Sequence, residues 1–132
     1  MLNNPNWSPP DVELADWQKL IRDGIAVLEE SDWCMGLWSS YPESKKEAFC
    51  VVGAIQKAMW GCPKKTFPPR GDFDSTEQAI AYHTALDKLH AVVGKYIWNW
   101  NDSLPNHDEY VRERSKQRAI YVMQRAMNVR DV

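Results

Sequence analysis

Hydrophobic residues recur at every third or fourth position in four segments of the chain, which is the spacing of amphipathic helices. The first segment follows the proline-containing start signal at residues 8–11 and runs to about Glu30. The other three cover about residues 44–60, 75–94 and 106–126, and each opens with a polar residue that is followed three positions later by Glu or Gln. Because this opening is typical of helix N-termini, the pattern predicts four helices.

The segments between these helices carry other signals. Residues 31–41 contain tryptophans and a glycine without a clean period, which predicts a packed connection. Residues 62–74 hold three prolines beside basic residues, which predicts an exposed loop. Strand-like alternation is confined to Tyr96, Trp98 and Trp100. We therefore predict an all-α fold: a compact single-domain bundle of about four helices with a proline-rich loop.

Length and composition support one domain over residues 1–132, with a core at about 11–127 and an N-terminal tail at 1–8. The 132 residues are 44% hydrophobic and 26% charged, which is ordinary globular composition. Sixteen Lys and Arg stand against eighteen Asp and Glu, a net charge of -2, so bulk nucleic-acid binding is not favoured. No apolar run is long enough to span a bilayer, which predicts no membrane association. The three cysteines cannot all pair and no secretory leader is evident, so we expect a reduced, cytoplasmic protein.

The cysteines and histidines do not form a recognised metal-binding pattern. The chain has no C-x-x-C, and His83 and His90 are seven residues apart rather than at the four-residue metalloprotease spacing. We predict no metal, no cofactor and no catalytic residue. The alternative is a small hydrolase-like enzyme in which Cys50 or Asp102 works with one of these histidines.

The stretch KYIWNWNDSLPNHDE, residues 95–109, has two interpretations. In the first interpretation it is a corner between two helices, and the side chain of Trp100 fills the inside of the corner. Asn101 adopts the left-handed conformation, and Asp102 caps the turn at residues 103–105.

In the second interpretation, the same stretch lines a pocket. Trp98 or Trp100 would stack on a planar ligand, while neighbouring amides and a carboxylate would select the ligand's polar edge. Seven tryptophans in a short chain also suit binding anchors, although most are expected in the core. The predicted ligand- or partner-binding residues are Trp98, Asn99, Asn101, Asp102 and Trp33.

Three short motifs carry a resemblance to a known family: Trp33-Cys-Met-Gly36, the helix segment at residues 49–55 with its Cys-x-x-Gly-Ala, and Trp100-Asn-Asp102. In this order they resemble a small uncharacterised family of bacterial and phage proteins, over about residues 11–127. Cys34 and the proline-rich loop depart from the family pattern. The family has no assigned activity, so the resemblance implies a fold and not a reaction. It also implies that Gly53 and Ala54 are small because another helix or the corner approaches them.

These observations leave two classes of function. The first is a non-enzymatic binding protein of phage or mobile-element type, whose partner is a protein or a small nucleotide-like ligand. Such a protein would inhibit a host defence component by surface masking or by sequestering a nucleotide signal. The second is the hydrolase-like enzyme. An exposed aromatic patch would favour the first, and a cluster of Cys50, a histidine and Asp102 would favour the second.

Overall fold

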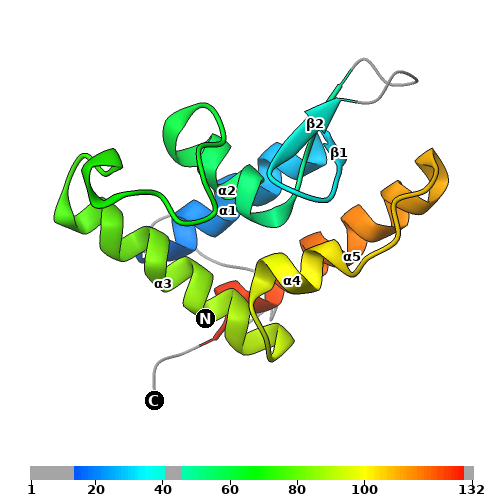
Figure 1. Ribbon diagram of the computed structural model, residues 1–132. Helices are drawn as coiled ribbons and strands as arrows, with labels where there is room; N and C mark the ends of the chain where they lie inside the picture. Colours follow the sequence, from blue (N-terminus) through cyan, green and yellow to red (C-terminus); the bar gives the residue numbers. More distant parts are fainter. Residues whose placement is uncertain (1–13, 41–45, 130–132) are drawn as a thin grey trace, which may run out of the picture.

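The computed structural model describes residues 14–40 and 46–129. These residues form five α-helices, three short strands and one 3-10 turn (Figure 1). In chain order they are α1 Asp16–Glu29, β1 Asp32–Trp33, β2 Trp38–Ser40, β3 Glu47–Phe49, α2 Val51–Trp60, η1 Arg70–Asp72, α3 Thr76–Val93, α4 Ile97–Asp102 and α5 Glu109–Met127.

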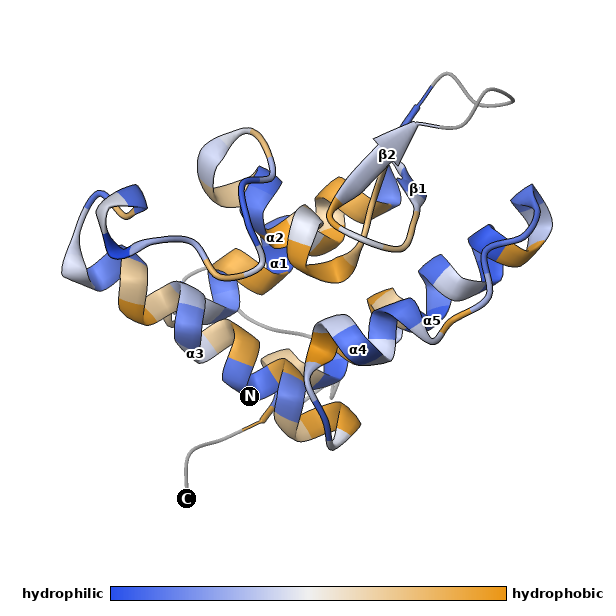
Figure 2. Cartoon of the chain, viewed as in Figure 1, coloured by the Kyte–Doolittle hydropathy of each residue, from blue (hydrophilic) through white to orange (hydrophobic). Residues whose placement is uncertain are grey.

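The helices enclose one hydrophobic core. α1 packs against α2, α3 and α5, while α4 bridges α2 and α3. The most hydrophobic segments lie on α1 and α2 in the middle of the molecule, and α5 is largely hydrophilic (Figure 2). α1 buries Leu20, Ile21, Ile25 and Leu28, which recur at the helical spacing read from the sequence. All four predicted helices thus form around this core, as α1, α2, α3 and α5.

The predicted start signal of α3 is confirmed by its hydrogen bond, whereas α5 is capped by Asp108 and not by Asn106, the polar residue of the predicted pattern. Ser75 Oγ accepts from the backbone N–H of Gln78 at 3.0 Å, and Asp108 Oδ1 accepts from that of Val111 at 2.8 Å. Each bond satisfies a backbone donor that the first turn of a helix leaves unpaired. Gly94 ends α3 with a left-handed φ of 74°. The predicted start signal of α1, residues 8–11, and the tail at 1–8 lie outside the described residues.

The prediction of an all-α fold is wrong in one respect, because a small sheet is present. β3 is its central strand and pairs parallel with β1 and antiparallel with β2. The predicted second helix begins later than expected: Glu47–Phe49 is a strand, Cys50 is the N-cap, and α2 starts at Val51. Ser44, the predicted cap, lies outside the described residues. Pairing with segments distant in the chain overrides the local capping pattern here.

The connections between the helices differ from expectation in two places and agree in a third. The predicted packed connection at residues 31–41 contains β1 and β2. The alternating Tyr96, Trp98 and Trp100 belong to the N-cap and body of a helix, α4, and not to a strand. The proline-rich segment at 62–74 contains only the short turn η1, so the prediction of a loop is confirmed.

Gly53 stands where the chain passes directly over α2. A Cβ at this position would lie 1.7 Å from the carbonyl oxygen of Leu37. The prediction of a close approach at Gly53 is therefore confirmed, but the approaching segment is the chain entering β2 rather than another helix or the corner. Only glycine fits between these two backbones.

No helix in the described part of the chain has the length and apolar character that crossing a membrane requires.

We expect Gly53→Ala to destabilise the protein by about 3 kcal/mol or more, above the usual range for overpacking, because the obstructing atom is backbone and cannot rotate away. Urea denaturation followed by circular dichroism measures the effect. Gly71→Ala is the control: a Cβ there meets no atom within 4 Å, so the change should stay within about 0.5 kcal/mol. Equal stability of the two variants would contradict the close approach.

Candidate functional site

The three sequence motifs meet at one buried junction around Asn101, whose side chain is 1% exposed. Its Oδ1 accepts from the indole Nε1–H of Trp33 at 2.9 Å and from the backbone N–H of Val51 at 3.1 Å. Its Nδ2 donates to the carbonyl of Cys34 at 3.1 Å. One amide thereby ties α4 to the end of β1 and to the first turn of α2.

Asp102 extends this junction at the surface. Its Oδ1 accepts from the backbone N–H of Gly36 at 3.1 Å, at a residue with a left-handed φ of 76°. The predicted roles of the corner are therefore wrong in detail. Asp102 holds the β1–β2 connection rather than the turn at 103–105, and Asn101 lies inside a right-handed helix. No residue other than glycine has a positive φ in the described ranges.

Cys50 and Cys34 flank the junction as buried thiols. Cys50 Sγ accepts from the backbone N–H of Gly53 at 3.2 Å, and Cys34 Sγ donates to the carbonyl of Ala48 at 3.4 Å. Burial raises the pKa of each thiol to about 12, and for Cys50 this outweighs the opposing effect of the Gly53 hydrogen bond. Such thiols stay protonated at neutral pH and are poor nucleophiles, so a capping role suits Cys50 better than catalysis.

Four side chains, two exposed and two half-buried, form a ring cluster that we call the aromatic surface: Phe67, Tyr96, His90 and Trp98. The rings of Tyr96 and Trp98 are stacked, with centroids 4.8 Å apart and an interplanar angle of 7°. Phe67 and His90 meet Trp98 edge-on, at 4.7 and 5.2 Å. Phe67 is 70% exposed and Tyr96 58%, so large ring areas face solvent. Exposed aromatic groups of this size are typical of binding surfaces.

The aromatic surface is held by hydrogen bonds from the elements below it. The backbone N–H of Ile97 donates to His90 Nδ1 at 2.9 Å, which fixes the imidazole at the start of α4. Gln56 and the hydroxyl of Tyr82 bond to the carbonyls of Lys65 and Thr66, which anchors the loop just before Phe67. The rings are thus presented by a supported backbone.

Three exposed cationic side chains adjoin the aromatic surface along the chain. Lys65 and Arg70 bracket Phe67 in the loop, and Lys95 precedes Tyr96. Within the residues that the structure describes, none of the three forms an ion pair, so their charges are available to an anionic ligand.

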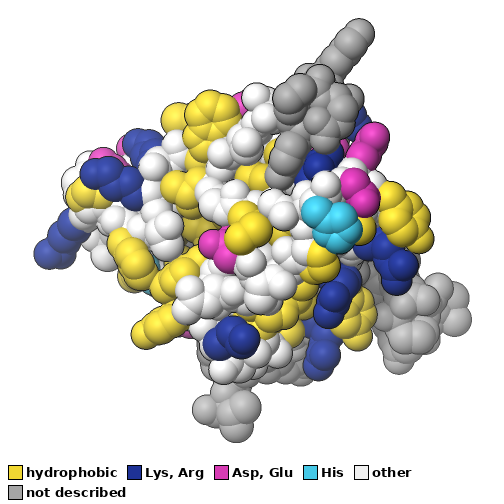
Figure 3. Space-filling model, turned by 45° about the vertical axis from the view of Figure 1, so that its right-hand side comes forward, with side chains coloured by type: hydrophobic (Ala, Val, Ile, Leu, Met, Phe, Trp, Pro, Cys, Tyr) yellow, Lys and Arg dark blue, Asp and Glu magenta, His cyan; other side chains and the backbone are white. Residues whose placement is uncertain are grey.

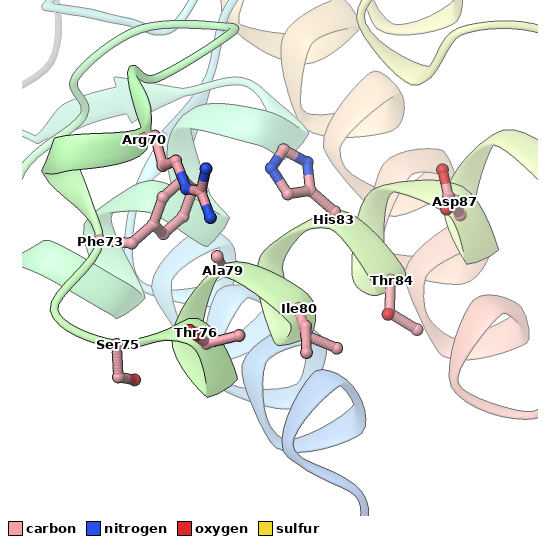
Figure 4. Close-up of a pocket in the computed structure, with 9 residues that line it drawn as sticks. All are labelled: Arg70, Phe73, Ser75, Thr76, Ala79, Ile80, His83, Thr84 and Asp87. Atoms are coloured by element: carbon pink, nitrogen blue, oxygen red, sulfur yellow. The ribbon is translucent and has the colours of Figure 1, made fainter.

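A groove of about 480 Å³ runs along α3 (Figure 4). Arg70 and Phe73 border it from the loop side, and His83 lies against the Phe73 ring at 5.6 Å. Asp87 lines its other end and acts on the pKa of His90 through its charge. The groove therefore brings a guanidinium, an imidazole and a carboxylate together along α3, and the carboxylate of Asp87 acts on His90 of the aromatic surface.

The predicted site residues separate into two groups. Trp33 and Asn101 are buried in the junction, whereas Trp98 is half-buried and Asn99 and Asp102 are exposed. The binding role of all five stays a prediction, and of the five only Trp98 lies in the aromatic surface.

Sequence reasoning missed Phe67, Tyr96 and Arg70 as parts of a binding surface. The signal that was available is Phe67, an aromatic residue between the lysines and the arginine of the proline-rich loop.

Among the side chains of residues 14–40 and 46–129, no three His, Cys, Asp or Glu are grouped so that they could hold a metal ion. The expectation of a metal-free protein stays a prediction.

Comparison with known proteins identifies one match. A family model with the description "Family of unknown function (DUF6197)" matches residues 14–128. No curated protein and no solved structure matches the chain.

We expect Asn101→Leu to cost about 3 kcal/mol or more of unfolding free energy, because it leaves the Trp33 indole N–H, the Val51 N–H and the Cys34 carbonyl buried without partners. Chemical denaturation measures the loss. Asn99→Leu, on the exposed side of the same helix, should change stability by less than about 0.5 kcal/mol. A loss below about 1 kcal/mol for Asn101→Leu would show that the junction does not depend on this amide.

Stability should fall in mild acid because of His90. Burial lowers the pKa of His90 below its usual 6.5, so the folded state prefers the neutral ring that accepts from Ile97. The stability that this preference contributes is fully present above the pKa of His90 in the unfolded state. It is lost as the pH falls from about 6.5 through the lowered pKa of the folded state. Thermal unfolding between pH 7.5 and pH 5 should therefore show a larger loss in the native protein than in His90→Asn. The same pH dependence in both proteins would exclude His90 as its origin.

Proposed function

Because the chain belongs to the DUF6197 family, whose function is unknown, we propose a function from its own geometry: it is a non-enzymatic binding protein that holds a small nucleotide-like ligand on the aromatic surface.

The observation that carries this proposal is the stacked pair of the exposed Tyr96 and the half-buried Trp98, with Phe67 in a T-shaped contact with Trp98. A planar heterocycle that stacks on such a platform gains about 1–3 kcal/mol for each base, and stacking tolerates different bases. The parallel arrangement of the two rings is already present without a ligand, so little ordering has to accompany binding.

Charge supports an anionic ligand at the same place. Lys65, Arg70 and Lys95 have no ion-pair partner among the described residues, and a guanidinium matches the oxygens of a phosphate in a bidentate manner. Arg70 also lines the groove on α3 together with His83, which offers a second donor. In the proposed complex the base of the ligand stacks on the aromatic rings and its phosphate lies toward Arg70. The ligand then uses both the aromatic surface and the cations.

The hydrolase-like alternative has less support. The Cys50 thiol is buried with a pKa raised to about 12, and the Nδ1 of His90 accepts a backbone hydrogen bond. A protonated thiol and an engaged imidazole do not make a nucleophile and its base.

The narrower proposal concerns the biological setting. We propose that the protein serves a phage or mobile element by sequestering a nucleotide signal of a host defence system. Masking the surface of a defence protein is the other route to the same inhibition. Expression of the protein in bacteria that carry a nucleotide-signalling defence should lower the level of free signal if sequestration operates.

Calorimetric titration with adenosine monophosphate, adenosine and ribose 5-phosphate tests the proposed ligand class. Adenosine monophosphate should bind more tightly than adenosine or ribose 5-phosphate, because only the nucleotide contacts both the aromatic rings and the cations. Trp98→Ala should weaken nucleotide binding by about 2 kcal/mol, roughly 30-fold. Because the indole is only half-buried, stability should fall by less than the about 3–5 kcal/mol typical of a fully buried aromatic residue.

Trp38→Ala is the matched control, since Trp38 is 54% exposed on β2 and lies outside the aromatic surface. It should leave the affinity unchanged. Failure of adenosine and guanosine mononucleotides and cyclic dinucleotides to bind would refute the ligand class, and an unchanged affinity in Trp98→Ala would refute the site.

A further inference from the structure

A second surface lies on the exposed face of α5. From Arg114 onward, every exposed side chain of this helix is Arg, Gln or Tyr. They are Arg114, Gln117, Arg118, Tyr121, Gln124 and Arg125. We call this set the α5 face. It carries three positive charges and no acidic residue, although the whole chain has a net charge of -2.

Two of these arginines are held in place by tyrosines one turn earlier. The Arg114 guanidinium lies 5.8 Å from the ring centre of Tyr110 and donates to its hydroxyl at 3.4 Å. The Arg125 guanidinium lies 5.9 Å from the ring centre of Tyr121. Stacking restricts the rotamers of both side chains while their outer N–H groups remain free to bind. At about 1.5 Å per residue, these two cations are roughly 16 Å apart along the helix.

Acidic side chains do not neutralise this face. Glu113 is the acid next to it, and it is already paired with Lys116 at 3.0 Å and accepts from Gln117 at 3.3 Å. Across the described ranges, no ion pair involves Arg114, Arg118 or Arg125. Three arginines are thus available to an anionic partner.

An apolar groove adjoins the cations. It has a volume of about 420 Å³ and is lined by Trp100, Gln117, Arg118, Tyr121 and Val122. Trp100 is half-buried at its edge and Tyr121 is 58% exposed. On the face shown in Figure 3, dark blue basic side chains alternate with yellow hydrophobic ones toward the lower right, so charge and apolar surface are interleaved. Trp, Tyr and Arg are the residue types that dominate binding energy at protein interfaces.

We propose that the α5 face and this groove bind an acidic amphipathic segment of a protein partner. The carboxylates of the segment pair with Arg114, Arg118 and Arg125, and an apolar side chain enters the groove beside Trp100. A nucleic-acid backbone would use the arginines but has no aliphatic side chain for the groove, so the combination favours a peptide.

This surface is independent of the proposed nucleotide site. The aromatic surface is built by the loop, the end of α3 and the start of α4, whereas the α5 face contributes none of those residues. Trp98 and Trp100 are two positions apart on α4 and so project to different sides of that helix. Either proposal can fail without the other.

The test uses three fluorescent probes and the full-length protein. The first is an 18-residue peptide with Leu at helical i, i+3, i+4 and i+7 spacing and Glu at most other positions. The second carries Gln in place of each Glu, and the third is a 20-base-pair DNA duplex. In fluorescence anisotropy the acidic peptide should bind at least tenfold more tightly than either of the others, with an affinity that falls as salt rises.

Charge reversal then locates the binding surface. Arg118→Glu and Arg125→Glu should each lower the affinity for the acidic peptide at least tenfold. Tyr121→Ala should lower the affinity for both peptides. Lys19→Glu on α1 makes the same change of charge away from the face and should have less than a twofold effect. Circular dichroism checks that each variant is folded, and Arg118→Ala provides a milder substitution at the same exposed position.

Three results would overturn the proposal. If the Gln peptide binds as tightly as the acidic peptide, the arginines do not recognise carboxylates. Tighter binding of the duplex would identify a nucleic-acid surface instead. An equal loss in Lys19→Glu would show that only net charge matters.

Discussion

The buried amide of Asn101 is the contact on which the arrangement of the other elements depends. β1 has only two residues and β2 and β3 have three each, so the sheet has few hydrogen bonds of its own. Asn101 adds hydrogen bonds that the short strands do not make. Its side chain accepts from the indole N–H of Trp33 and from the first backbone N–H of α2, and it donates to the carbonyl of Cys34 at the end of β1. In a dry interior these bonds matter because each group would otherwise be buried without a partner.

Two further contacts close the same junction from outside. Asp102 accepts from Gly36 at the turn after β1, and the Leu37 backbone crosses α2 at Gly53, where no larger residue fits. The three motifs that are separate in the sequence are therefore parts of one structural unit. Holding α4 in this way orients its remaining side chains, so that Trp98 joins the aromatic surface and Trp100 lines the groove beside α5. A structural junction and two candidate binding surfaces share one six-residue helix.

Local charge distinguishes these surfaces from the average of the chain. A net charge of -2 argues against general attraction to anions, yet in the described part of the chain Lys65, Arg70, Lys95 and the three arginines of the α5 face have no ion-pair partner. Glu113, the acid next to the α5 face, is already paired with Lys116. Over distances shorter than the Debye length of about 8–10 Å, the neighbouring charges decide which ligand is attracted.

The sequence by itself determined the helices α1, α3 and α5, because their apolar period and their caps at Ser75 and Asp108 are local signals. It also indicated close backbone contact at Gly53. It did not reveal the sheet, since strands of two or three residues have no readable period and are stabilised by partners elsewhere in the chain. The roles of Asn101 and Asp102, and the meeting of Phe67 with Trp98, were likewise decided only by the tertiary structure. Each is a contact between residues at least 31 positions apart, and local pattern carries no information about such distances.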